Sequence, residues 1–149
     1  SADYINYTVE QVGLNFVQLH GNESPEFCYA INRPVIKGLR LSSLNDTGKI
    51  AAYKESTWRI LLDTPTHKWG GTGETHDWNL ARTIAQETSI LLAGGLTPEN
   101  VADAIVQVHP WGVDVSSGVE TNGHKDVKKI QTFIQNVRTV RNTRQPRKS

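Results

Sequence analysis

The sequence predicts the α/β class, in which helices alternate with the strands of a parallel sheet. Five short runs of apolar and β-branched residues recur at intervals of roughly 20 to 30 residues, the length of one strand-plus-helix unit. Two of these runs are nearly continuously apolar, which is typical of parallel strands covered on both faces. Segments with helical periodicity fill the intervals. This alternation favours a parallel sheet with right-handed crossovers.

Local patterns place the individual elements. We expect strands at residues 15–19, 35–39, 59–62, 89–93 and 112–115. Ser24 and Thr97 are each followed by proline and glutamate, the order typical of an N-cap and first helical turn, so a helix is expected to begin at each. A further helix should end near Val12. The last helix should begin at about Asp126 and bury its apolar residues Val127, Ile130, Phe133, Ile134, Val137 and Val140.

Composition limits the class of protein. The chain has 149 residues, of which 37% are hydrophobic and 21% charged, as in a soluble globular domain. Its net charge of +1 argues against a protein built as a whole for nucleic acid or membrane binding. The single cysteine, Cys28, excludes an internal disulfide framework and suits a reducing compartment. No apolar run has the length of a membrane span or the form of a signal peptide, so we expect a cytoplasmic location.

The predicted organisation is one domain at residues 4–140 followed by a basic, disordered tail at residues 141–149. The tail could bind nucleic acid, but solvation of its charges is the favoured interpretation. The chain lacks methionine and begins at Ser1, which suggests a processed or shortened product. By strand count alone, five strands favour an open doubly wound sheet, because a (βα)8 barrel needs eight strands and about 200 residues or more.

A glycine-rich segment follows the expected strand that ends near Asp63. Its sequence from Gly71 to His76 lacks the third glycine of a dinucleotide fingerprint, and no Lys-Ser/Thr pair follows as in a P-loop. A nucleotide-binding role is therefore disfavoured. The segment is either an ordinary connection or a lid behind a strand-end carboxylate.

Two other small-residue sites suit phosphate better. Gly94-Gly95 and Ser116-Ser117-Gly118 end two consecutive expected strands, where backbone N–H groups can approach an anion closely. A phosphate between the loops after two late strands is a recurring barrel arrangement. Two tight turns are the alternative interpretation, and phosphate binding is favoured.

Four blocks, "VQLHGNESPEFC", "LLDT…GGTGETHDW", "LLAGGLTPENV" and "GVDVSSGVETNGHKD", together resemble the phosphoribosylanthranilate isomerase family of tryptophan biosynthesis. The resemblance extends from about residue 7 to residue 140. It implies a partial (βα)8, TIM-barrel-like fold in which these five strands correspond to strands four to eight of the barrel. The implied reaction is the Amadori rearrangement of N-(5′-phosphoribosyl)anthranilate, without metal or cofactor.

The resemblance also assigns residues. Asp63 would be the general acid that opens the ribose ring, with the glycine segment as a lid. Residues implied in substrate and phosphate binding are His20, Gly94, Gly95, Asp114, Ser116, Ser117 and Gly118. From the residues alone, Asp63 could equally be a structural aspartate, and His20 a structural histidine.

Two departures from the family pattern are visible. His76 stands where the family usually has phenylalanine. The family's general base, a cysteine at the end of its first strand, and an arginine near its second have no counterpart in this sequence. Cys28 cannot substitute for the base, because it lies inside the helix after Ser24 and is expected to be a small buried residue.

Three explanations remain open for such a chain. It could be part of a split barrel that needs a complementing N-terminal segment, a truncation that self-associates, or an inactive flavodoxin-like or half-barrel sheet that binds phosphate compounds. We expect the isolated chain to be inactive or to need a complementing segment. The expected partners are a phosphorylated sugar and either a second copy or that segment. The strands at residues 16–19 and 112–115 are the expected unpaired edges.

Overall fold

The computed structural model describes residues 1–41, 43, 47–64 and 78–144. The glycine segment with His76, and the last residues of the basic tail, lie outside the described residues. The five expected strands are all present, with ends shifted by one or two positions. They are β1 (Val17–Leu19), β2 (Val35–Arg40), β3 (Arg59–Asp63), β4 (Ile90–Ala93) and β5 (Gly112–Val113).

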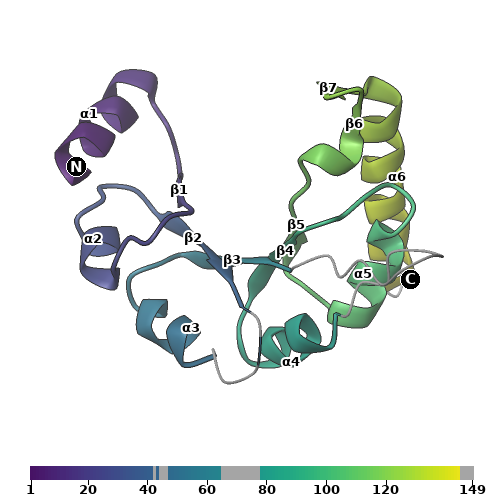
Figure 1. Ribbon diagram of the computed structural model, residues 1–149, viewed down its shortest axis with the longest axis horizontal. Helices are drawn as coiled ribbons and strands as arrows, with labels where there is room; N and C mark the ends of the chain where they lie inside the picture. The colour runs from purple at the N-terminus through teal and green to yellow at the C-terminus, as the bar shows by residue number, and fades with distance from the viewer. Residues whose placement is uncertain (42, 44–46, 65–77, 145–149) are drawn as a thin grey trace, which may run out of the picture.

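The sheet follows chain order. Each strand pairs in parallel with the next, giving the order β1-β2-β3-β4-β5. A doubly wound sheet reverses its strand order at a switch point, as in the flavodoxin-like order 2-1-3-4-5, so the prediction made from strand count alone is wrong. Figure 1 shows the sheet as an arc with the helices on its outer, convex side. β1 and β5 are the two ends of this sheet.

Six helices lie in the described part of the chain: α1 (Ala2–Val12), α2 (Pro25–Tyr29), α3 (Gly48–Tyr53), α4 (Asn79–Glu87), α5 (Val101–Val108) and α6 (Val127–Arg144). After β5 comes a 3-10 turn, η2 (Ser117–Val119), and then an unpredicted antiparallel hairpin of β6 (Glu120–Thr121) and β7 (His124–Lys125). Among these residues, no helix is long and apolar enough to cross a membrane.

The two predicted helix starts differ in outcome. Ser24 caps α2 as expected, because its Oγ accepts a hydrogen bond from the Phe27 N–H at 3.3 Å. The prediction at Thr97 is wrong by three residues, since the N-cap of α5 is Asn100 and the helix begins at Val101. Thr97 still makes the contacts of a helix start, because its carbonyl accepts a hydrogen bond from the Val101 N–H at 3.1 Å and its N–H donates to the Asn100 side chain at 2.8 Å.

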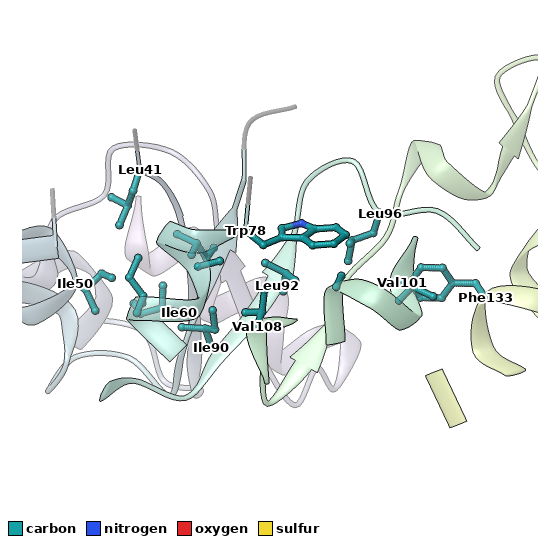
Figure 2. Close-up of a cluster of buried hydrophobic side chains, with 14 of the residues drawn as sticks. Leu41, Ile50, Ile60, Trp78, Ile90, Leu92, Leu96, Val101, Val108 and Phe133 are labelled. Carbon is teal, nitrogen blue, oxygen red and sulfur yellow. The ribbon is translucent and has the colours of Figure 1, made fainter. Parts of the chain in front are cut away.

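The main core lies between the sheet and α4, α5 and α6. Ile60, Ile90 and Leu92 point from the strands into this cluster (Figure 2). From α6, Phe133 is buried, while Ile130 and Val137 pack against the cluster. A smaller cluster behind β1 and β2 contains Leu19, Cys28, Ile31 and Val35.

The predicted burial of α6 is partly wrong. Val127 and Ile134 are 66% and 43% exposed. Positions 130, 133 and 137 form one row facing α5, and this row needs spacings of only three and four residues. Ile134 is displaced around the helix from that row, and Val127 lies in the first turn, before α6 reaches the core. Val140 is half-buried.

Candidate active site at the carboxyl ends of the strands

The predicted site residues gather at one end of the sheet. His20 directly follows β1, Asp63 is the last residue of β3, Gly94 follows β4, and Asp114 follows β5. Because all five strands are parallel, their carboxyl ends meet at the same edge, where α/β proteins place their ligands. The site is therefore assembled by topology from residues far apart in sequence.

Asp63 is held by a neighbour that the sequence analysis did not identify. Arg40, the last residue of β2, lies opposite Asp63 in the strand register. Its Nε donates a hydrogen bond to Asp63 Oδ2 at 3.2 Å, and its Nη2 donates to the same oxygen. The Asp63 side chain is 17% exposed, whereas that of Arg40 is 73% exposed. The strand-end position of Arg40, in the run "VIKGLR", was the available clue.

Gly94 brings the exit of β4 against Asp63. Its φ is +90°, and a side chain there would overlap the Thr64 carbonyl oxygen and come within 2.7 Å of Asp63 Oδ1. The hydroxyl of Thr64 donates a hydrogen bond to the Ala93 carbonyl at 2.9 Å, which fixes the two strand exits together. Only glycine permits this close approach. The predicted acid and the first predicted phosphate loop are thus in contact.

The two predicted phosphate loops also touch each other. A Cβ added to Gly118 would overlap the carbonyl oxygen of Leu96, which follows Gly94-Gly95 in the loop after β4. Gly95 has a φ of +61°, so two consecutive residues adopt a conformation that favours glycine. The small residues in both loops therefore permit this packing, whatever else they bind.

A lysine lies beside the second loop. Lys125 Nζ, from β7, donates hydrogen bonds to the Ser116 carbonyl at 3.0 Å and to Ser116 Oγ at 3.3 Å. It also pairs with Glu120 at 2.7 Å. The unpredicted hairpin thus brings a cation to the predicted phosphate loop. The available clue was Asn122-Gly123 between the two short strands, because this pair is typical of a two-residue hairpin turn and both residues have positive φ.

His20 stands over a glycine of the neighbouring strand. A Cβ on Gly38 would lie 2.6 Å from the imidazole ring, so glycine leaves room for the ring. Next to it is a cavity of about 550 Å³, lined in part by His20, Gly38, Arg40, Lys49 and Tyr53. Its lining thus includes two cationic side chains, Arg40 and Lys49, and the aromatic ring of Tyr53.

The loop after β1 is fixed by a buried lysine. Lys37 is fully buried in β2, and its Nζ donates to the carbonyls of Gly21 at 2.7 Å and Gly38 at 3.1 Å. It also forms an ion pair with Glu23 at 3.2 Å. Burial alone raises the pKa of Glu23, but its hydrogen bonds and the Lys37 charge outweigh burial, so the pKa is lowered. By sequence alone, Lys37 is part of an apolar run.

Cys28 is a buried residue, as predicted. It lies in α2, is 2% exposed, and packs in the smaller cluster with Leu19, Ile31 and Val35. Burial raises the pKa of its thiol, which keeps it in the unreactive form at neutral pH. Within the described residues, no group of three or more histidine, cysteine, aspartate or glutamate side chains could hold a metal ion.

The chain is similar in sequence to a known family of enzymes. The family described as N-(5′-phosphoribosyl)anthranilate (PRA) isomerase matches residues 1–136. The N-(5′-phosphoribosyl)anthranilate isomerase of Pelobacter propionicus is 45% identical over 138 residues, covering 92% of this chain and 66% of the relative. The chain thus spans about two thirds of the length of this relative.

Solved structures of the same family are similar to this chain. The phosphoribosyl anthranilate isomerase of Thermotoga maritima is similar with a TM-score of 0.80 and 42% identity, covering 93% of this chain and 68% of that one. A second structure, with a TM-score of 0.78 and 39% identity, covers 93% and 66%. It holds the enzyme in complex with reduced 1-(o-carboxyphenylamino)-1-deoxyribulose 5-phosphate. With these matches, the chain belongs to the phosphoribosylanthranilate isomerase family.

Proposed function

We propose that this chain carries the acid and the phosphate site of a phosphoribosylanthranilate isomerase. The substrate is N-(5′-phosphoribosyl)anthranilate, and the product is 1-(2-carboxyphenylamino)-1-deoxyribulose 5-phosphate. The observation that carries the proposal is the contact of Asp63 with Gly94, whose loop in turn packs against Gly118. A carboxyl group and two small-residue loops thus share one strand-end edge, where a single ligand can contact both.

Asp63 acts as the general acid in this proposal. Its proton goes to the ribose ring oxygen, the bond from that oxygen to C1′ breaks, and the amine nitrogen forms a Schiff base with C1′. A base then removes the C2′ proton, and the resulting enolamine becomes the aminoketone. A positioned acid typically contributes about 100- to 10,000-fold to the rate.

The phosphate is held by the two touching loops. Gly94, Gly95, Ser116, Ser117 and Gly118 supply backbone N–H groups and hydroxyls, which are suitable donors to phosphate oxygens. His20 and Asp114, at the ends of β1 and β5, contact the sugar. Support for this assignment comes from their common position at the strand ends.

We further propose that the five strands are strands four to eight of a barrel and that the base comes from a complementing segment. Cys28, the one cysteine of the sequence, is buried in α2 and is not that base. β1 and β5 end the sheet, and the rings of Phe16 and Trp111, which both pack against Trp58, remain 43% and 55% exposed. Unpaired apolar edges favour association with a complementing segment or with a second copy.

Enzyme assays test the function. We expect isomerase activity when the chain is mixed with the first three strand–helix units of the Pelobacter propionicus relative. The reaction is monitored by the change in fluorescence of the aromatic amine. Asp63→Asn should then lower turnover by about 100- to 10,000-fold with the fold intact. No activity in any mixture, or a loss smaller than tenfold in the variant, would contradict the proposal.

Light scattering over a dilution series tests the association separately. We expect the chain alone to form dimers or larger species at high concentration. A compact monomer at every concentration, with no binding of a hydrophobic dye, would contradict self-association but leave the catalytic assignment untouched.

A further inference from the structure

A cluster of aromatic rings and one arginine lies at the amino ends of the strands, opposite the candidate active site. Phe16, Trp58 and Trp111 directly precede β1, β3 and β5. The centroid of the Trp58 ring lies 4.6 Å from that of Phe16 and 5.1 Å from that of Trp111. Arg59 is the first residue of β3, and we call these four residues the amino-end cluster. The cluster connects the two end strands of the sheet through the middle strand.

Arg59 points to the concave side of the sheet. Its neighbour Ile60 belongs to the core between the sheet and the helices, which lie on the convex side (Figure 1). Successive side chains of a strand point to opposite faces, so Arg59 and Asp63 share the concave face. Four residues along β3 separate them, which is about 13 Å in a strand. The amino-end cluster is therefore distinct from the proposed sugar-phosphate site.

The hydrogen bonds of the Arg59 guanidinium are incomplete. Its central carbon lies 4.7 Å from the ring centroid of Trp58 and 5.1 Å from that of Trp111. Its Nη1 donates a hydrogen bond to the Trp58 carbonyl at 2.8 Å. Its Nε is buried without an acceptor, and no carboxylate in the described part of the chain pairs with it. Buried donors are rarely left in this state, so the guanidinium is suited to a further acceptor.

A segment that covers the amino-end cluster must bring an anion. The rings of Phe16 and Trp111 offer exposed apolar area for burial. Covering them would also withdraw the Arg59 guanidinium from water, and a buried charge is tolerated when it is paired. A carboxylate matches this need, because it accepts two parallel N–H groups of a guanidinium and Nε can supply one of them.

A second copy of the chain does not provide this anion. The commonest dimers are two-fold symmetric and bring the same surface of both subunits together. Such a dimer would place one amino-end cluster against another and add a second guanidinium beside Arg59. A strand that extends the sheet beyond β1 or β5 fits better, because its inward side chains reach the concave face.

We propose that the amino-end cluster is the docking site of a complementing barrel segment, and that Arg59 pairs with an aspartate or glutamate at the amino end of one of its strands. This rests on the proposed function, in which such a segment completes the sheet. The aromatic rings supply apolar area. The ion pair selects the register of docking, because a shift of one residue would turn the carboxylate to the other face.

Binding of the first three strand–helix units of the Pelobacter propionicus relative tests the proposal. The titration is followed by tryptophan emission, which should move to shorter wavelength as Trp58 and Trp111 leave water. Arg59→Gln should weaken binding by about 10- to 100-fold, as expected for hydrogen bonds to a charged group. Arg59→Lys keeps the charge without the fork and should recover part of the loss. Arg82→Gln removes an exposed arginine of α4 and should change the affinity by less than twofold.

A scan of the segment identifies the partner of Arg59. Each aspartate and glutamate in its strands is changed to the corresponding amide. One of these variants should lose about as much affinity as Arg59→Gln does, and combining the two should weaken binding no further. The amide variants leave this chain unchanged, so they test the pair even where Arg59→Gln does not fold. Circular dichroism shows whether each variant is folded.

The outcomes separate this inference from the proposed function. If Arg59→Gln binds the segment as tightly as the parent chain, or if every amide variant adds to its effect, the Arg59 pairing is wrong while the complementing segment stands. If the parent chain does not bind the segment at all, the proposal of a complementing segment fails, and the inference fails with it.

Discussion

Replacing Lys37 with methionine tests how the loop after β1 is held. The substitution keeps the length of the side chain, so it creates no cavity. It removes the Nζ donor from the Gly21 and Gly38 carbonyls and the ion-pair partner from Glu23. The three groups that lose their partner differ in exposure. Gly38 is buried, Gly21 is exposed, and the Glu23 side chain is 25% exposed.

The magnitude follows from these environments. Removing one partner of a buried ion pair costs about 3–5 kcal/mol because the other charge is left unpaired. Here Glu23 reaches solvent, so the lower end applies. Leaving the buried Gly38 carbonyl without a donor costs about a further 1–3 kcal/mol. Part of this total is offset, because the variant no longer has to bury the Lys37 ammonium group. We expect a net loss of about 3 kcal/mol, or about 6–12 °C in Tm for a chain of this size.

Urea and thermal unfolding of Lys37→Met measure the loss. The exposed Lys54→Met is the matched control and should change the free energy of unfolding by less than about 0.5 kcal/mol. Glu23→Gln should be destabilising in the parent but neutral or stabilising beside Lys37→Met, because it removes the unpaired charge. A loss below about 1 kcal/mol in Lys37→Met, or additive effects of the two variants, would refute this account of the loop.

Three more results are expected. Gly118→Ala should destabilise the chain by about 1–3 kcal/mol in urea unfolding, because its Cβ would overlap the Leu96 carbonyl, and an unchanged midpoint would contradict the contact. The pKa of Glu23 is lowered from 4.5, so its contribution to stability is present above that pH and is lost as pH falls through the folded value; Glu23→Gln should therefore show a flatter stability profile below pH 4.5. Cys28 should react with a thiol reagent at the rate of unfolding, and fast labelling of the native chain would show that the thiol is accessible.

Much of the fold was predictable because its signals are local. Apolar β-branched runs located all five strands, and Ser24 with its proline and glutamate located a helix start. Thr97 carries the same three-residue pattern, yet the N-cap of α5 is Asn100, three residues later. The prediction of which α6 side chains are buried failed for another reason. The apolar positions predict a face of the helix, but the neighbouring α5 determines which row of that face is covered.

The candidate site was predictable only in part, because no single segment of the sequence determines the register between two strands. Asp63 and Gly94 could each be placed at a strand end, yet their contact depends on the pairing of Asp63 with Ala93 across β3 and β4. The same pairing between β2 and β3 sets Arg40 opposite Asp63. A shift of one residue would turn Arg40 to the other face of the sheet. The hydrogen bonds of Lys37 hold the end of β2 against the loop after β1, so they position His20 and its loop, while the separate pairing of β2 with β3 positions Arg40.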